Sequence, residues 1–315
     1  MDLLILELID PEIMRWLSER HRVRFAPELA SDPHQLREAL YDARALILPS
    51  SVPLDKTMLH FAPELRIVGR VSGSMDNIDA AGCAQAEVEV VRNPTATAVA
   101  EAEFMIGALL QMLRQTPIEN SEGMLAGREL GTATVGLVGM APAARSVAQL
   151  LASFGSRVVG YDPALHSSNP SWERWRVEPM SLRQLFEQCD AVCVQLGYYS
   201  RYRGLIGERV LPYCKQHQVM VSVSPSGLFD EAVLAQALRT RRMAGVWFDS
   251  VEAGMLDSGR PLHGLANLRV TPRIASTTQE SLNRNAWAVA QRIDEMLQAA
   301  PPRWFRGTSP ADFSA

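Results

Sequence analysis

Short apolar runs alternate along the chain with longer segments whose apolar residues recur at helical spacing. In the first part, the runs that we interpret as strands are residues 3–8, 21–26, 43–50 and 65–72. Segments with helical periodicity lie between them or follow them, at residues 10–20, 32–42, 54–63 and 97–115. Strands that alternate with helices usually pair in parallel, so this order predicts a parallel sheet covered by helices.

The same alternation starts again near the middle of the chain. Strands are predicted at residues 132–139, 156–163, 190–197, 218–224, 243–251 and 268–275. Helices are predicted at residues 141–155, 181–188, 229–242 and 278–300. We therefore predict an α/β protein with two doubly wound parallel-sheet domains. The outer domain is expected at residues 1–95 and 283–315, and the inner one, inserted in it, at residues 96–282.

Composition and charge exclude several classes of partner. The formal net charge is −4, which gives no electrostatic reason to expect binding to nucleic acid or to an anionic membrane. The apolar N-terminus contains Asp2, Glu7 and Asp10, and no apolar run reaches the length of a membrane span, so we predict a cytoplasmic protein. The cysteines lack the spacing of a metal site and are predicted to be reduced and buried: Cys83, Cys189, Cys193 and Cys214.

The turn after residues 132–139 has the spacing of a dinucleotide-binding loop. Gly139 ends the strand, a helix begins three residues later, and Asp162 closes the next strand. In such a loop the glycines allow a tight bend and the approach of pyrophosphate, and the acidic residue holds a ribose hydroxyl. However, Ala141 puts a methyl group at the second glycine position, and Pro142 removes a backbone N–H. The turn therefore indicates either a dinucleotide site or a βαβ unit without a ligand.

The order of several further segments along the chain, and the spacing between them, resemble those of a known family. These segments are residues 62–94, 100–115, 127–139, 156–163, 203–211, 227–252 and 267–281. Together they resemble the D-isomer-specific 2-hydroxyacid dehydrogenase family, in its phosphoglycerate dehydrogenase-like branch. The resemblance implies two Rossmann-like domains, NAD in the inner one, reduction of 2-keto acids, and a homodimer formed through the inner domain. Because no Arg follows Asp162, NAD is favoured over NADP.

The cofactor candidates are residues at the turns of the inner domain. They are Gly139, Ala141, Pro142, Ala143, Asp162, Gln195, Ser224 and Asp249. The resemblance implies that Asp249 contacts the nicotinamide carboxamide, although an Asp at a strand end is equally able to cap a turn.

The positions that carry the family's catalytic Arg, Glu and His are all changed here. The resemblance puts Pro225 at the Arg position, Gly254 at the Glu position with Glu252 close by, and Arg273 at the His position. In the substrate loop, Ser72 and Ser74 replace glycines. The skeleton of the family is kept while its usual chemistry is lost.

Arg273 is the substitution with the clearest chemical consequence. Arginine does not release a proton near neutral pH, so it does not replace a histidine acid. Its guanidinium is suited to grip an anion with a bidentate fork, a task that Pro225 no longer performs. The alternative is that Arg273 pairs with a nearby acid such as Glu252 and fills space.

Other candidates are weaker. Arg70 either lines the substrate site or is a strand-end charge, and His263 offers either a titrating group or a solvated loop side chain. Tyr198 and Tyr199 follow a strand end and either lie near the nicotinamide or pack elsewhere.

Three functions are compatible with the sequence. The first is an NAD-dependent oxidoreductase with diverged catalytic residues, which acts on a small anionic substrate that differs from the family's 2-hydroxy acids. The second is a catalytically inactive protein that binds a nucleotide or anion. The third is a non-redox enzyme that reuses the same fold.

Overall fold

The chain divides into two units, each built around a parallel sheet. The computed structural model describes residues 1–71, 77–91, 93, 95–119, 121–197 and 199–299. One unit contains Met1–Ala96 and the segment that begins at Gln279, and the other contains Thr97–Thr278. The second unit is therefore an insertion between two segments of the first, and the predicted α/β class with two parallel sheets is confirmed.

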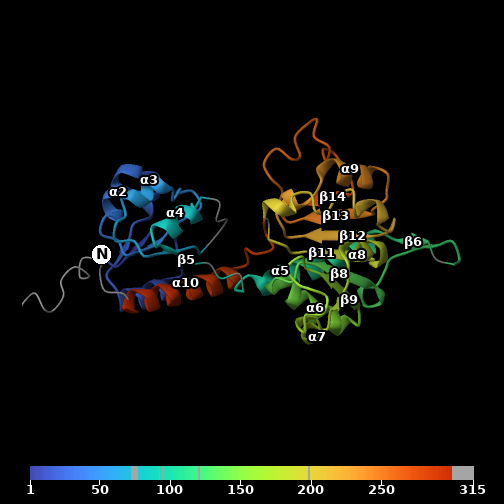
Figure 1. Cartoon of the computed structure of the whole chain (residues 1–315), viewed down its shortest axis with the longest axis horizontal. Helices are drawn as coiled ribbons and strands as arrows, with labels where there is room; N and C mark the ends of the chain where they lie inside the picture. The colour runs from blue at the N-terminus through green and yellow to red at the C-terminus, as the bar shows by residue number, and fades with distance from the viewer. Residues whose placement is uncertain (72–76, 92, 94, 120, 198, 300–315) are drawn as a thin grey trace, which may run out of the picture. The chain divides into compact units, whose positions relative to one another are not determined.

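The first unit is a parallel sheet with helices on both faces (Figure 1). Its strand order is β2-β1-β3-β4-β5, with β1 (Leu3–Ile5), β2 (Val23–Phe25), β3 (Ala45–Ile47), β4 (Ile67–Gly69) and β5 (Glu89–Val91). Its helices are α1 (Pro11–Ser18), α2 (Pro33–Leu40), α3 (Lys56–His60), α4 (Ala80–Gln85) and α10 (Gln279–Ala299). Apolar residues of α1 and α10 cover one face of the sheet, and those of α2, α3 and α4 cover the other.

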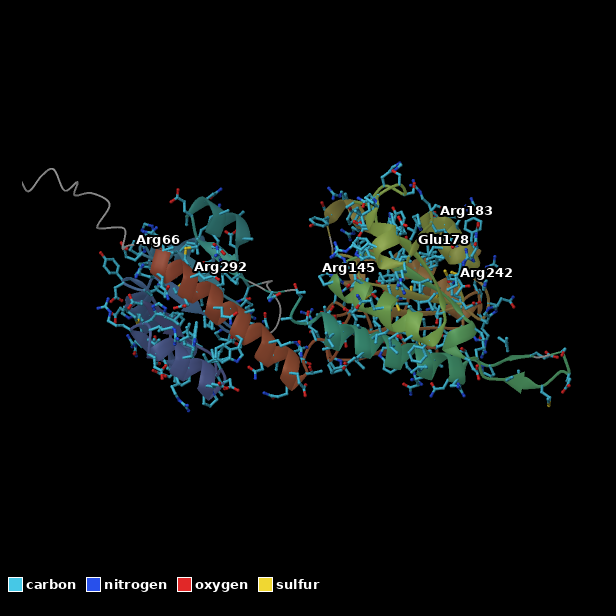
Figure 2. All side chains as sticks on the ribbon, turned by 90° about the horizontal axis from the view of Figure 1, so that it is seen from below. Arg66, Arg145, Glu178, Arg183, Arg242 and Arg292 are labelled. Carbon is cyan, nitrogen blue, oxygen red and sulfur yellow. The ribbon has the colours of Figure 1, made fainter. Side chains whose placement is uncertain are left out.

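Helix α10 joins this unit although it lies far along the chain. Gly69 on β4 allows it to pack closely, because a Cβ at this position would lie 2.4 Å from Cγ1 of Val289. Arg292 on α10, which is labelled in Figure 2, also forms an ion pair with Glu89 on β5, with an Nε–Oε1 distance of 2.8 Å. The helix is therefore part of the core of the first unit.

The second unit is a larger parallel sheet of order β10-β9-β8-β11-β12-β13-β14. The strands are β8 (Thr134–Val138), β9 (Arg157–Tyr161), β10 (Glu178–Pro179), β11 (Ala191–Val194), β12 (Val219–Ser222), β13 (Gly245–Phe248) and β14 (Leu268–Val270). The helices are α5 (Ala98–Gln115), α6 (Pro142–Phe154), α7 (Ser171–Trp175), α8 (Leu182–Gln188) and α9 (Glu231–Arg239). Helices α5 and α6 pack on one face, and α8 and α9 on the other.

Several elements differ from the sequence prediction. The strand predicted at 268–275 ends at Val270, because Pro272 lacks an N–H and the amides that follow bind Asp249. The next helix begins at Gln279, so Arg273 lies in a turn and not at a helix start. The antiparallel hairpin of β6 (Ile118–Glu119) and β7 (Leu125–Ala126), which projects from the second unit in Figure 1, was also not predicted, and neither were α4, α7 and β10.

The structure also bears on the predicted state of the cysteines and on membrane-spanning helices. The four cysteines are free and buried, as predicted, and burial raises the pKa of Cys193 to about 12. Across the described residues, no helix is long and apolar enough to span a bilayer.

The turn from β8 into α6 gives a first testable prediction. Gly139 has a φ of +89°, and a Cβ there would lie 2.1 Å from the carbonyl oxygen of Gln195. Gly139→Ala is expected to lower the free energy of unfolding by about 3 kcal/mol, because it combines backbone strain with overpacking. The measurement is chemical denaturation.

Gly107→Ala is the matched control, because Gly107 lies within α5 and a Cβ there meets no atom within 4 Å. This variant is expected to be as stable as the parent or up to about 1 kcal/mol more stable. Equal stability of the two alanine variants would contradict the close approach of the turn to β11.

Candidate functional site

One edge of the sheet in the second unit gathers most of the predicted site residues. Because β8, β11, β12 and β13 are parallel, their carboxyl ends lie at the same edge. The turns after them carry Gly139, Gln195, Ser224 and Asp249, and the turn after β14 carries Arg273. In open parallel sheets this edge is where ligands bind.

Asp162 ties the turn after β8 to the end of β9. Its Oδ2 accepts a hydrogen bond from the N–H of Met140 at 2.8 Å, and its Oδ1 accepts one from the N–H of Ala164, also at 2.8 Å. The N–H of Gly139 donates to the carbonyl of Tyr161 at 2.7 Å. Each carboxylate oxygen keeps lone-pair capacity for another donor, such as a ribose hydroxyl.

The N-terminus of α6 has fewer free amides than a glycine-rich loop. Pro142 at the first helical position has no N–H, and the N–H of Ala144 donates to Oε1 of Gln195 at 2.7 Å. Within the described part of the chain, the amides of Ala141 and Ala143 donate to no other group. These two amides are therefore the donors left for a pyrophosphate. The residues fit a dinucleotide, although neither Pro142 nor Ala144 offers it a free amide.

Gln195 also joins this turn to α5. Its Nε2 donates to Oε2 of Glu101 at 2.6 Å, so one amide side chain bridges two helices. Burial raises the pKa of Glu101, hydrogen bonds from Thr97 and Gln195 act against this, and the charge of Asp249 raises it further. Glu101 was not among the site residues predicted from the sequence. The signal was an acidic residue in the first turn of an otherwise apolar helix.

Asp249 shapes the turn that carries Arg273. Its Oδ1 accepts hydrogen bonds from Thr271 Oγ1 at 2.9 Å and from the N–H of Ile274 at 2.8 Å, and its Oδ2 accepts one from the N–H of Ala275 at 3.0 Å. Its carbonyl accepts from the N–H of Arg273 at 2.6 Å. Burial raises the pKa of this carboxyl, while the three hydrogen bonds and the charge of Arg273 act to lower it. Asp249 therefore caps a turn in this structure.

Arg273 is exposed and has a φ of +56°. Among the described residues, no ion pair joins it to Glu252 or to another carboxylate. Glu252 is exposed too, and its backbone N–H donates to Oγ of Ser226 at 3.1 Å. The structure thus gives no support to the alternative in which Arg273 and Glu252 neutralise each other.

Ser224 lies on a turn next to the turn of Gly254, and it directly precedes Pro225. Oγ of Ser224 accepts a hydrogen bond from the N–H of Leu196 at 2.7 Å, which joins the ends of β11 and β12. Pro225 precedes a short 3₁₀ helix, Ser226–Leu228, and offers no side-chain donor. Gly254 has a φ of +79°, a conformation that a glutamate adopts only with strain.

The remaining candidates do not join this group. His263 is exposed, and its Nδ1 lies 2.8 Å from the carbonyl of Leu256. The Tyr199 ring is exposed and packs edge-on against Tyr202. Ser72, Ser74 and Tyr198 lie outside the described residues. No cluster of His, Cys, Asp and Glu suited to a metal ion occurs in the described ranges.

Arg70 belongs to the first unit, at the carboxyl end of β4. It is buried, and its Nη1 donates to the carbonyl of Leu48. Its Nε and Nη2 are also buried and have no hydrogen-bond partner in the described residues. Burial lowers its pKa, and the nearby charge of Glu7 opposes this. Arg70 is therefore a buried cation, not a solvated strand-end charge.

The comparison with known families agrees with this arrangement. Residues 104–275 match the NAD-binding domain of D-isomer specific 2-hydroxyacid dehydrogenase. The chain belongs to the D-isomer-specific 2-hydroxyacid dehydrogenase family. The predicted resemblance is confirmed, and so is NAD as the cofactor of the matched domain.

Three similar proteins illustrate the membership. An (S)-sulfolactate dehydrogenase of Chromohalobacter salexigens is 30% identical over 305 residues, which cover 94% of this chain and 98% of that protein. A D-3-phosphoglycerate dehydrogenase of Mycobacterium bovis is 30% identical over 298 residues, 92% of this chain and 56% of that protein. The chain thus spans about half the length of that relative.

The third is a solved structure. The NAD⁺-bound 3-phosphoglycerate dehydrogenase of Entamoeba histolytica has a TM-score of 0.73 and 19% identity, with 95% of each chain covered. At this identity the likeness concerns the fold. Both units of the present chain are therefore built as in this dehydrogenase family.

The Glu101–Gln195 bridge leads to a prediction about pH. Because the pKa of Glu101 is raised in the folded protein, this carboxyl favours folding when it is protonated. The stability that protonated Glu101 contributes is lost as the pH rises from the ordinary pKa of a carboxyl through the higher pKa of Glu101 in the folded protein. Glu101→Gln does not ionise, so its stability relative to the parent is expected to increase from acidic to neutral pH.

Urea denaturation at several pH values measures this difference. Glu103→Gln is the control, because Glu103 is an exposed residue of the same helix. A stability difference between Glu101→Gln and the parent that does not change with pH would contradict the assignment of a raised pKa.

Proposed function

We propose that the chain is an NAD-dependent oxidoreductase of the 2-hydroxyacid dehydrogenase type whose substrate and proton-transfer chemistry have diverged. The observation that carries this proposal is Arg273, an exposed cation at the family's histidine position on a turn held by Asp249. The scaffold for the cofactor is kept, while Pro225, Gly254 and Arg273 replace the usual catalytic set.

The cofactor contacts follow from the groups left free at the turns. When bound, NADH would supply the hydride for reduction, and NAD⁺ would accept it in the reverse direction. We assign the ribose hydroxyl to Asp162, whose oxygens keep acceptor capacity, and the pyrophosphate to the amides of Ala141 and Ala143. Gln195 is assigned a positioning role, since it holds Ala144 and Glu101 together.

Arg273 is assigned to substrate binding. A guanidinium stays charged at neutral pH and binds a carboxylate, sulfonate or phosphate through two N–H donors. The names of the relatives point to substrates of this kind, because sulfolactate and phosphoglycerate each carry a second acidic group besides the carboxylate. We therefore propose a small anionic substrate, and we include Arg70 as a second candidate cation.

The remaining family properties are also proposals for this chain. A homodimer through α5 and the β6–β7 hairpin is supported by exposed apolar side chains on these elements, namely Leu110, Ile118, Met124 and Leu125. A cytoplasmic location is proposed from the reduced cysteines.

A second candidate function is a catalytically inactive protein that binds a nucleotide or anion. Two features favour it over an enzyme. Pro142 and the Gln195–Ala144 hydrogen bond reduce the donors at the N-terminus of α6, and none of the family's catalytic groups is at its usual position.

Cofactor binding is the first test of the proposed function. NADH is expected to bind saturably, and NADPH at least about tenfold more weakly, because Asp162 meets the 2′-phosphate with a like charge. Fluorescence titration with each nucleotide measures both affinities. Absence of NADH binding up to millimolar concentration would sink the proposal.

Restoring the catalytic set is the second test. The triple variant Pro225→Arg, Gly254→Glu and Arg273→His is expected to reduce 2-keto acids with NADH at a measurable rate, whereas the parent does not. Histidine tolerates the positive φ at residue 273 better than most residues, but glutamate at residue 254 costs about 1 kcal/mol. The double variant that keeps Gly254 separates this strain from chemistry. A folded triple variant that binds NADH but stays inactive would show that substrate binding has diverged as well.

A further inference from the structure

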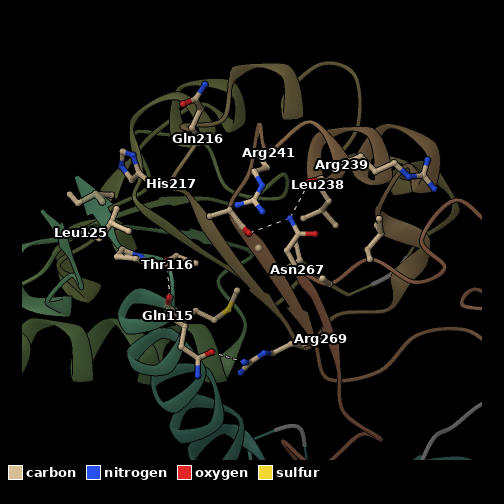
Figure 3. A pocket seen from close by; sticks show the side chains of 18 of the residues that line it. Gln115, Thr116, Leu125, Gln216, His217, Leu238, Arg239, Arg241, Asn267 and Arg269 are labelled. Atoms are coloured by element: carbon tan, nitrogen blue, oxygen red, sulfur yellow. Dashed lines mark hydrogen bonds between the residues drawn. The ribbon is translucent and has the colours of Figure 1, made fainter. Parts of the chain in front are cut away.

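The second unit has hollows on two different surfaces. One, of about 940 Å³, lies at the amino ends of β13 and β14 (Figure 3). Its wall includes the end of α5 and the β6–β7 hairpin, through which we propose that the homodimer forms, so a second copy of the chain would cover it. The other hollow has a volume of about 870 Å³ and lies between α6 and α7. It uses neither α5 nor the hairpin.

The hollow between α6 and α7 runs along one side of α6. The α6 residues that line it recur at intervals of three or four positions, so they share one face of the helix: Arg145, Ala148, Gln149, Ala152 and Ser153. From the first to the last of them the helix rises by about 12 Å. The hollow therefore extends away from the cofactor turn that precedes α6.

The charges on this wall are all positive. Arg145, Arg174 and Arg176 line the hollow, and no acidic residue is among the described residues that do so. The side chains of Arg174 and Arg176 are exposed and form no hydrogen bond or ion pair within the described part of the chain. Three cations without a carboxylate make this surface attractive to anions.

Other arginines close to these elements are already paired. Arg157 on β9 forms an ion pair with Glu178 at 2.8 Å, and Arg183 on α8 forms one with Glu187 at 2.8 Å. Arg145, Arg183 and Glu178 are labelled in Figure 2. The three arginines of the hollow thus differ from these two in having no acidic partner in the described chain.

Arg145 is held in place at the wall. Its Nε donates to the carbonyl of Met140 at 2.8 Å, and its Cζ lies 4.6 Å from the centre of the Trp175 ring. Its Nη1 and Nη2 donate to no group in the described residues. A guanidinium that is fixed in this way loses little freedom when it binds an anion.

The backbone at Arg176 also indicates a use for its side chain. Its φ is +55°, and it follows the last residue of α7, a position where glycine is the usual residue. An arginine in this conformation is strained, and such strain often occurs at binding sites.

We propose that this hollow binds a small polyanion with at least two phosphate or carboxylate groups. Arg145, Arg174 and Arg176 donate charge-assisted hydrogen bonds to it, and no carboxylate among the described lining residues opposes the attraction. Because the three guanidiniums come from separate positions on the wall, two anionic groups satisfy them better than one. The site goes beyond the proposed function, since none of the residues assigned to NAD or to the substrate lines it.

The test is isothermal titration calorimetry of the full chain with pyrophosphate and with citrate. Saturable binding of at least one of them is expected, and the tighter of the two identifies the anionic group. Acetate, with a single charge, is expected to bind at least about tenfold more weakly. The titrations are repeated with saturating NADH, which occupies the amides of Ala141 and Ala143. The affinity for the polyanion is expected to persist, because the hollow is a separate site.

The double variant Arg174→Gln and Arg176→Gly tests the assigned residues. The affinity for the polyanion is expected to fall about tenfold or more, the usual effect of losing hydrogen bonds between charged groups. Glycine suits the positive φ at residue 176, so the melting temperature is expected to equal or exceed that of the parent. Loss of binding without loss of stability separates a binding role from a structural one.

Arg24→Gln with Arg209→Gln is the matched control, because both are exposed arginines outside the hollow and the change in net charge is the same. This control is expected to bind the polyanion like the parent. Equal affinities of the parent, the control and the Arg174/Arg176 variant would overturn the proposal, and so would the absence of saturable binding. Complete displacement of the polyanion by NADH would also overturn it, since the anion would then occupy the cofactor site. The comparison of variants holds even if NADH does not bind, so it is independent of the proposed function.

Discussion

The close contact between the turn after β8 and the end of β11 is the constraint on which the cofactor edge depends. Only a residue without a Cβ lets the turn at Gly139 meet the carbonyl of Gln195. This contact fixes the backbone of Gln195, and its side chain then reaches both Ala144 on α6 and Glu101 on α5. The absence of a side chain at Gly139 thus allows the contact from which Gln195 reaches both α6 and α5.

The same edge combines two partly buried carboxyls with an exposed guanidinium. Burial raises the pKa of both Glu101 and Asp249, hydrogen bonds act against this in each case, and the charge of Arg273 also lowers the pKa of Asp249. Arg273 is carried on the turn that Asp249 holds. An anion bound at this place would therefore meet two carboxyls that already accept hydrogen bonds and an exposed guanidinium that forms no ion pair within 4.0 Å in the described residues.

The sequence predicted the order of the main strands and helices, because their periodicity is strong and their N-caps are acidic or hydroxyl residues such as Asp10 and Asp230. It also predicted the turns at Gly139, Asp162 and Asp249, because these residues belong to motifs that can be recognised by their spacing along the chain. It did not reveal Glu101, whose importance comes from a contact with Gln195 across 94 positions. Nor did it predict that the strand before Arg273 stops at Val270, because that depends on where the carboxylate of Asp249 lies in space.

The insertion of one unit into the other has a consequence for how the protein is made. The second unit is continuous in sequence, so all its strands are available once residue 278 has been synthesised. The sheet of the first unit is complete much earlier, at β5, but the helix that packs on Gly69 has not yet been translated. During that interval only α1 packs on this apolar face of the sheet, and the part that α10 covers stays exposed while the whole inserted unit is produced. Such a face is a binding surface for chaperones and a risk for aggregation, and it disappears only when Val289 and Ile293 arrive.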